Sequence, residues 1–389
     1  MRNRKYMIGI ILVCMSTLSA CSAIEQFLPT ATAVPPTKTP KPIFTPTPLP
    51  GYSGYMNSLI FFNTYYGDEV EVLMSNMTFK EALPISEPGD GYWGIGVFLA
   101  GSGSRLAFVN YNRTSEEMSV WVREFESGKL WEVLAAGATY STPDNFDLSP
   151  DGKFLLYTDA QPDGSERDIY RLEVDTGYIV NLTDGHKWDN SPDWSPDGER
   201  IAFVSDRLTD GISFDEIYVM DKDGGSITRL TNNGFWEDTS PAWSPDGEKI
   251  AFVRWSLNEE EIPSGGPAGL WVINADGSDE QLITDTLVNN IQTLAWSPDG
   301  QYIAYVDGVM GRNGNLFVVK SDGSRNPEQI GTLPGEYSNP QWSLDSQALL
   351  FTIKDEYNSI YFAMKNGDLL SLVLEGATNG VWLNPEWIK

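Results

Sequence analysis

The sequence has very few of the side chains that carry most enzymatic and metal chemistry. Its 389 residues include two cysteines and one histidine, His186. This shortage excludes cysteine–histidine nucleophile pairs and metal sites built from several histidines. A serine–histidine–aspartate triad would depend on His186, and the sequence has no Gly-x-Ser-x-Gly segment to expose its serine. We therefore expect no enzyme, no catalytic residue and no cofactor.

Positive charge is also scarce. The chain has 26 lysine and arginine residues against 54 aspartate and glutamate residues, a net charge of -28. A surface this acidic repels DNA and anionic lipid headgroups, so nucleic acid is excluded as a partner. Paired carboxylates, as in some glycosidases, are the one catalytic device left. Because most acidic residues fall in loops and turns, where they are solvated, no pair stands out.

Residues 1–20 are typical of a secretory signal. Three basic residues precede an apolar run over 7–15, which is shorter than the roughly 20 residues needed to span a bilayer. The segment then reads Leu-Ser-Ala before Cys21, which resembles the lipobox of bacterial lipoproteins. The resemblance implies that Cys21 is acylated and anchors the chain in a lipid membrane. An ordinary signal peptide before an incidental cysteine is the alternative.

Residues 21–50 are expected to form a linker. From 29 to 50 the sequence is mostly proline and threonine, so it buries too little apolar surface to fold and is expected to be extended. One folded domain is expected over 51–389. The signal places it in the cell envelope on the extracytoplasmic side, in the periplasm or at the cell surface.

The folded part consists of repeats whose marker residues are 45 to 53 positions apart, the period of a four-stranded propeller blade. The clearest copy has Trp-Ser-Pro-Asp-Gly at 194–198, apolar and aromatic runs at 201–204 and 216–220, and a Leu-Thr ending at 230–231. Proline, aspartate and glycine in the first turn suit a bulged hairpin, and an Asp-Gly turn follows the aromatic run. Each repeat therefore predicts four antiparallel strands.

The count of second strands gives seven repeats. These strands begin at 59, 106, 154, 201, 250, 303 and 349. No first strand precedes residue 59, whereas an extra one is indicated at 384–388, ending at Trp387, so the last strand would complete the first blade and remove two open edges. We predict an all-β fold, a seven-bladed β-propeller of four-stranded antiparallel blades closed by the C-terminal strand. Six blades are the alternative.

The Pro-x-Trp-Ser-Pro-Asp-Gly-x-x-Ile-Ala-Phe pattern at 192–203, with the aromatic strand and the Leu-Thr ending, resembles the WD40-like repeats of TolB-like β-propellers. The resemblance covers roughly residues 95–389. It implies a periplasmic or surface propeller that contacts proteins. TolB propellers are usually six-bladed and follow an extra α/β domain, so the partner of TolB itself is not carried over.

A recognition face is predicted from aromatic residues that recur just before each first strand. In a propeller these loops open on one face around the channel, where acidic residues such as Asp215 also gather. The predicted face consists of Trp93, Trp188, Asp189, Trp236, Glu237, Asp238, Tyr337 and Trp382. The alternative is that the rings pack between blades. The tryptophans that mark the first strands, from Trp194 to Trp342, are expected in the core.

Two turns have partial calcium-loop patterns, with Asp221 and Asp223 in one and Asp276 and Asp279 in the other. Both turns lack the distal bidentate glutamate of a full loop, so these residues are weak metal candidates and no metal site is predicted.

Three functions stay open. The first is a lipid-anchored, non-catalytic propeller that binds a protein or peptide at the recognition face or acts as a scaffold. The second is a surface lipoprotein that binds carbohydrate by stacking these aromatic rings on sugar rings. The third and least favoured is a glycoside hydrolase or lyase. It requires a deep central pocket in which carboxylates of shifted pKa converge.

Overall fold

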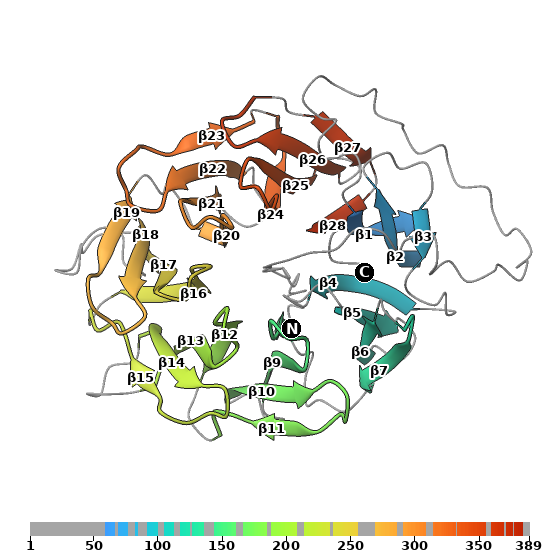
Figure 1. Cartoon of the computed structure of the whole chain (residues 1–389), viewed down its shortest axis with the longest axis horizontal. Coiled ribbons are helices and arrows are strands. Elements are labelled where there is room, and N and C mark those ends of the chain that lie inside the picture. Colours follow the sequence, from blue (N-terminus) through green and yellow to red (C-terminus); the bar gives the residue numbers. More distant parts are fainter. Residues whose placement is uncertain are drawn as a thin grey trace, which may run out of the picture.

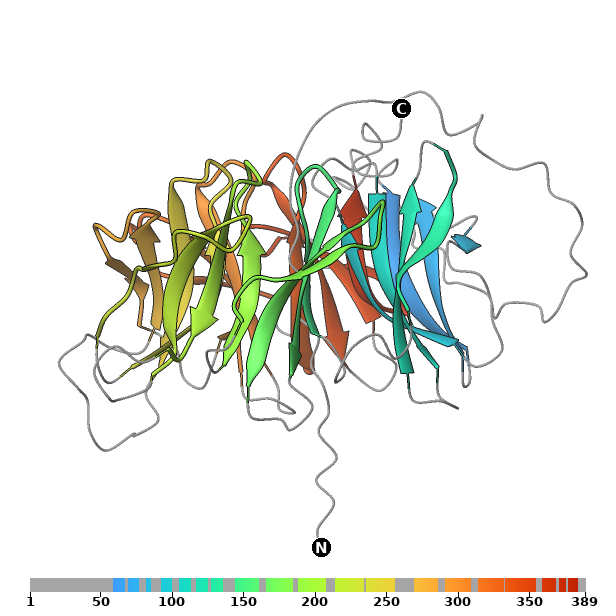
Figure 2. The same ribbon diagram turned by 90° about the horizontal axis from the view of Figure 1, so that it is seen from below.

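The computed structural model is a ring of β-sheets around a central axis (Figure 1). Seen from the side, the ring is a disc, and many of its strands run along the axis (Figure 2). The structure describes residues 59–66, 69–76, 82–84, 92–99, 105–112, 117–124, 127–135, 144–160, 166–184, 188–207, 214–233, 236–255, 269–285, 291–308, 314–331, 333–354, 359–368, 371–375 and 377–383. None of these segments contains a helix of the length and apolarity required to cross a membrane.

Five sheets have four antiparallel strands each, as the repeats predict. The first holds β8 (Asp144–Leu148), β9 (Phe154–Ala160), β10 (Arg167–Glu173) and β11 (Ile179–Asn181). The second holds β12 (Asp189–Trp194), β13 (Arg200–Ser205), β14 (Glu216–Asp221) and β15 (Thr228–Arg229). The third holds β16 (Glu237–Trp243), β17 (Lys249–Trp255), β18 (Gly269–Asn274) and β19 (Gln281–Thr284). The fourth holds β20 (Ile291–Trp296), β21 (Tyr302–Asp307), β22 (Asn315–Lys320) and β23 (Glu328–Ile330). The fifth holds β24 (Glu336–Trp342), β25 (Ala348–Lys354), β26 (Ser359–Met364) and β27 (Ser371–Glu375).

The sixth sheet has eight strands and contains both ends of the described chain. Its strands are β28 (Ala377–Leu383), β1 (Leu59–Tyr66), β2 (Glu69–Asn76), β3 (Ala82–Pro84), β4 (Tyr92–Leu99), β5 (Arg105–Asn112), β6 (Glu117–Glu124) and β7 (Leu130–Leu134). β2 and β4 are parallel and pair at one position, Val70 opposite Trp93. This pairing joins two sequence repeats into one sheet. The structure therefore has six sheets rather than the seven separate ones predicted, and the six-bladed alternative fits this number.

The C-terminal strand closes the ring, as predicted. β28 pairs antiparallel with β1, with Leu383 opposite Leu59 and Ala377 opposite Thr64. The closing strand lies at 377–383, earlier than the predicted 384–388, which is outside the described residues. Around the axis the innermost strands lie one against the next in the order β4, β8, β12, β16, β20, β24 and β28.

The core lies between neighbouring sheets. Trp243 of β16, for example, packs in one cluster with Val204 of β13 and Ile250 of β17. The marker tryptophans of the repeats are at most 6% exposed, which confirms that they belong to the core. They are Trp194, Trp243, Trp296 and Trp342.

The Ser-Pro-Asp-Gly turns hold the first hairpin of each repeat together. The Ser195 hydroxyl donates to Asp197 Oδ1 at 2.5 Å and accepts the backbone N–H of Arg200 at 2.9 Å. Gly198 has a positive φ of 69°, a conformation that glycine adopts without strain. The same serine–aspartate pair recurs in later repeats, for example Ser244 with Asp246 at 2.6 Å. The turn chemistry is therefore local and could be predicted.

Candidate central pocket and acidic rim

The innermost strands of several repeats carry a β-bulge at the same place. The register of β12 against β13 shifts between Asn190 and Asp193. At each bulge one non-glycine residue has a φ of 50° to 54°, and these residues are Asn145, Ser191, Ser240 and Asn339. Bulges re-aim neighbouring side chains and recur beside functional sites.

Three of these bulges, together with part of β20, line one pocket. Its wall includes Asp147 of β8, Asp193 of β12, Ser240 of β16 and Thr293 of β20. The pocket therefore lies on innermost strands of four neighbouring sheets, beside the centre of the ring (Figure 1). No lysine, arginine or histidine is among the described residues that line it.

The two aspartates of the pocket link neighbouring sheets. The backbone N–H of Trp194 donates to Asp147 Oδ2 at 2.7 Å, and that of Trp243 donates to Asp193 Oδ2 at 2.7 Å. Each aspartate thus holds the innermost strand of the next sheet through a charge-assisted hydrogen bond.

The following repeats are linked differently. They have Ala242 and Ala295 where the earlier repeats have aspartate. The indole Nε1 of Trp296 donates to the carbonyl oxygen of Ala242 at 3.0 Å, and Trp342 donates in the same way to Ala295 at 2.9 Å. The sheets therefore pack without a carboxylate at this position, so packing alone does not explain Asp147 and Asp193.

Both aspartates have raised pKa values. Burial raises the pKa of Asp193, which is 7% exposed, to about 7. Burial and then the charge of Asp193 raise the pKa of Asp147 well above its ordinary value. Since no cation in the lining compensates them, the charge of one carboxylate opposes ionisation of the other, and the two titrate as a pair. Raised carboxyl pKa values in a pocket are a mark of functional sites.

Asp147 and Asp193 are not among the site residues that the sequence predicts. The signal was the variable position of the Pro-x-Trp pattern, which is occupied by aspartate before Leu148 and Trp194 and by alanine in two later repeats. Their convergence in one pocket depends on the packing of separate sheets, which the pattern within one repeat does not specify.

The predicted aromatic face is at the surface only in part. Trp188 is 45% exposed, and its backbone N–H donates to Asp206 Oδ1 at 3.0 Å. Trp236 and Tyr337 are 2% and 1% exposed, so the prediction of exposed rings is wrong for them and the packing alternative holds. Trp93 lies in β4 and Trp382 in β28, and their side chains are outside the described residues.

Two acidic residues of that face are buried in ion pairs. Asp189 accepts Arg207 Nη2 at 3.0 Å on both oxygens. Asp238 accepts Arg254 Nε at 2.7 Å and Nη2 at 2.8 Å. Burial raises the pKa of Asp238 to about 6 although Arg254 opposes the shift. These carboxylates are neutralised inside the protein rather than presented to a partner.

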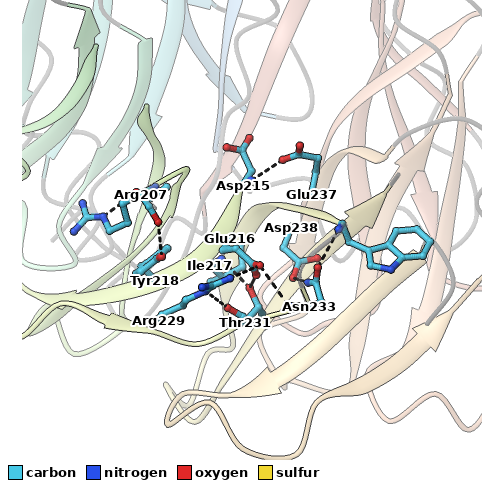
Figure 3. A network of polar contacts seen from close by, with 12 residues as sticks. Arg207, Asp215, Glu216, Ile217, Tyr218, Arg229, Thr231, Asn233, Glu237 and Asp238 are labelled. Carbon is cyan, nitrogen blue, oxygen red and sulfur yellow. Dashed lines mark hydrogen bonds and ion pairs between the residues drawn. The ribbon is translucent and has the colours of Figure 1, made fainter. Parts of the chain in front are cut away.

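A polar network connects the second and third sheets beside these pairs (Figure 3). Glu216 accepts Arg229 Nη2 and the Thr231 hydroxyl, each at 2.6 Å. Thr231, the threonine of the Leu-Thr ending, also accepts the backbone N–H of Ile217 at 3.0 Å. Asn233 Nδ2 donates to Asp238 Oδ2 at 2.7 Å and so reaches the next sheet. The Leu-Thr ending is thus a structural element of the repeat.

Near this network, Asp215 and Glu237 form a second carboxylate pair (Figure 3). The backbone N–H of Asp215 donates to Glu237 Oε2 at 2.6 Å. Burial, followed by the charge of Glu237, raises the pKa of Asp215 to about 7, and burial raises that of Glu237. The Asp215–Glu237 pair is acidic, but Glu237 Oε2 already accepts the backbone N–H of Asp215.

The weak calcium candidates lie in turns with protein partners. Asp223 accepts Arg171 Nη1 at 2.6 Å, and Asp276 accepts the Ser278 hydroxyl at 2.6 Å. Asp221 ends β14, and Asp279 has a φ of 55° in the turn before β19. Within the described segments no group of three or more His, Cys, Asp or Glu side chains is arranged to hold a metal ion. His186 and Cys21 lie outside these segments.

Several known proteins are similar to this chain in sequence or in fold. Residues 99–264 match the TolB beta propeller domain family. The solved structure of TolB from Acinetobacter baumannii is similar over 85% of this chain and 84% of its own, with a TM-score of 0.51 and 16% identity. An uncharacterized protein of Agrobacterium fabrum is 31% identical over 160 residues, 41% of this chain and 52% of that protein. These matches support a TolB-like β-propeller, as the repeat pattern predicted.

The segments that match curated relatives span about half of those proteins or less. Besides the Agrobacterium fabrum protein, one such relative is the Tol-Pal system protein TolB of Francisella tularensis, which is 33% identical over 86 residues, 22% of this chain and 19% of that protein.

The expectation that the chain is not an enzyme is corrected by similar proteins. A solved oligogalacturonate lyase in complex with manganese shares the fold over 79% of this chain and 86% of its own, with a TM-score of 0.62 and 14% identity. An uncharacterized peptidase, YuxL of Bacillus subtilis, is 38% identical over 88 residues, 22% of this chain and 13% of that protein. The fold occurs in enzymes, so the shortage of histidine and cysteine does not exclude catalysis.

Proposed function

We propose that this protein is a lipoprotein of the bacterial cell envelope whose propeller binds a protein or peptide partner at its central pocket. The observation that carries the proposal is the pocket itself. Bulges of neighbouring sheets surround two carboxylates that have no cationic partner in its lining. The similarity to TolB supports a protein-binding role and an envelope location. The exposed ring of Trp188 adds a second contact point.

The anchor belongs to the same proposal. Acylation of Cys21 would hold the chain on the membrane, and the linker of residues 21–50 would keep the propeller away from the lipid surface. Expression with an alkyne-labelled fatty acid tests this part. Label and membrane association should both be lost in Cys21→Ala. A labelled Cys21→Ala protein, or an unlabelled parent chain, would contradict it.

A crosslinked pull-down from envelopes tests the binding role. The parent chain should recover a specific partner, and Asp147→Asn with Asp193→Asn should reduce its recovery at least tenfold. Trp188→Ala should reduce it less. Tyr178→Ala is the matched control, because Tyr178 is an exposed aromatic residue, 67% exposed, in the turn before β11. Failure to recover any specific partner would contradict a binding role, and recovery that is indifferent to the pocket variants would contradict its location.

A second candidate function is supported by the raised pKa values of the pocket. A carboxyl group with a pKa of about 7, such as Asp193, is suited to general acid or base catalysis on a glycan. A screen of the parent chain against oligogalacturonate and other glycans tests this candidate. If the protein is such an enzyme, the parent chain should form product and Asp193→Asn should not. Asp285→Asn, which changes an exposed residue after β19, is the control and should retain activity. Absence of turnover on all the glycans would eliminate this candidate.

A further inference from the structure

We propose that the pocket between Asp147 and Asp193 binds a primary ammonium group, supplied by a lysine side chain of the partner. This inference rests on the proposed binding function and specifies the chemistry of the partner. Three observations support it. The pocket contains two carboxylates, Asp193 Oδ1 and Thr293 Oγ1 have no hydrogen-bond partner among the described residues, and no metal-binding group is found among those residues.

Negative charge in the pocket lacks a counterion. Two carboxylates converge there, while the other described residues of the lining are neutral. Asp193 uses Oδ2 for the backbone N–H of Trp243, and its Oδ1 has no partner among the described residues. An unpaired buried carboxylate is costly, and a cation beside it removes that cost. The site therefore favours a positively charged ligand.

An unpaired hydroxyl lies in the same wall. Thr293 is 6% exposed, and its Oγ1 has no hydrogen-bond partner among the described residues. Asp147, Asp193 and Thr293 together offer three acceptors from three innermost strands. A primary ammonium group has three N–H donors and needs three acceptors, so it matches this set in number.

The remaining wall suits the stem of a lysine side chain. Pro192, Pro241 and Leu294 provide apolar surface beside the carboxylates. The methylene groups of lysine pack on such surface while the charged end reaches an acidic group. A calcium ion would require six to eight oxygen ligands, whereas no described group of three or more acidic, histidine or cysteine side chains is arranged for a metal.

Isothermal titration of the full chain tests the inference. The probes are a blocked Ala-Lys-Ala peptide, the matched Ala-norleucine-Ala peptide, spermidine and calcium chloride. The lysine peptide should bind with saturation at pH 8 and the norleucine peptide should not. Asp147→Asn with Asp193→Asn should weaken binding at least tenfold, Thr293→Val several-fold, and Asp285→Asn should leave it unchanged.

The same titration at pH 5 should show weaker binding, because protonation removes the negative charge of the pair and no other residue in the described lining titrates.

Equal binding of the norleucine peptide, or lysine binding that survives the double substitution, overturns the inference. Binding of spermidine without the lysine peptide overturns the peptide source, and binding of calcium alone replaces the ligand with a metal. Circular dichroism of each variant verifies folding, since the side-chain carbonyl introduced by Asp193→Asn would still accept the N–H of Trp243.

The outcomes separate this inference from the proposed function. If the envelope partner is recovered equally by the parent chain and the double variant, the ammonium site fails while partner binding stands. If the lysine peptide binds but no envelope partner is recovered, the pocket chemistry stands and the proposed function fails.

Discussion

Asp193 has two roles that are in conflict. It holds the next sheet by accepting the N–H of Trp243, and it carries a charge in a place where burial raises its pKa to about 7. Alanine and an indole hydrogen bond provide the link between later repeats at lower electrostatic cost. Aspartate at this position therefore gives a lower free energy of unfolding than the alanine link would, which is characteristic of a functional residue.

The pH dependence of unfolding tests this cost. The pKa of Asp193 is higher in the folded state than the ordinary value of 3.8 in the unfolded state, so the folded chain binds more protons between these values. The free energy of unfolding should fall from pH 5 to pH 8, by on the order of 2 kcal/mol for this group. Urea unfolding at the two pH values should show a smaller fall in Asp193→Asn. An unchanged fall in that variant would show that Asp193 is not the cause, and Asp285→Asn is the control.

The buried pair of Arg254 and Asp238 should respond in a different way. Arg254 is 1% exposed, and Arg254→Met would leave the Asp238 carboxylate buried without its bidentate partner. Removal of one partner of such a pair costs about 3 to 5 kcal/mol. Urea unfolding should show a larger loss at pH 8 than at pH 5, because protonation relieves Asp238 at the lower pH. The added substitution Asp238→Asn should restore part of the loss, and a loss that is independent of pH would contradict this explanation.

Several of these residues could be assigned from the sequence because their roles are local. The Ser195–Asp197 turn lies within one repeat, and the burial of Trp194 follows from its place in the pattern. The burial of Trp236 and Tyr337 could not be predicted, since it depends on which loops pack under their neighbours.

The second turn of each repeat is an element that contacts the preceding sheet. At Gly224, with a φ of 84°, an added Cβ would lie 2.8 Å from the carbonyl oxygen of Leu182. The Asp-Gly signal predicts the reversal of the chain but not this close approach between sheets. The same limit applies to the bulges of the innermost strands, whose common position is visible only in the register.

Gly224→Ala and Gly128→Ala form a matched pair. Both glycines have a positive φ, but an added Cβ at Gly128 meets nothing within 4 Å. Gly128→Ala should cost about 1 kcal/mol for the left-handed conformation alone. Gly224→Ala should cost at least about twice as much, because backbone must also move. Thermal or urea unfolding measures the difference, and equal losses would show that the contact with Leu182 is unimportant.

The ring as a whole depends on the pairing of strands from the two ends of the described chain. The sequence predicted the closure because a first strand is lacking at one end and is in excess at the other. It did not predict that β2 and β4 pair, since a single bridge between Val70 and Trp93 is a tertiary contact without a repeat signature. This contact turns seven repeats of the sequence into six sheets.

Truncation tests the closure. A chain that ends at residue 376 lacks β28 and exposes β1 as an open edge, so it should melt at lower temperature and aggregate. A chain that ends at residue 383 keeps β28 and is the matched control. Thermal melting with size-exclusion chromatography distinguishes the two. Equal melting temperatures and elution would contradict the role of β28 in stability.

The proposed function requires Asp147 and Asp193 to form one charged binding pocket beside the axis of the ring. Carboxyl-carbon NMR of the full chain, labelled at aspartate and titrated with and without the Ala-Lys-Ala peptide, tests it most directly. We expect the two signals to titrate together, the pKa of Asp193 to be near 7, and the lysine peptide to move this titration to lower pH. Ordinary titration of both groups near pH 4, or a titration that the peptide does not move, would contradict it.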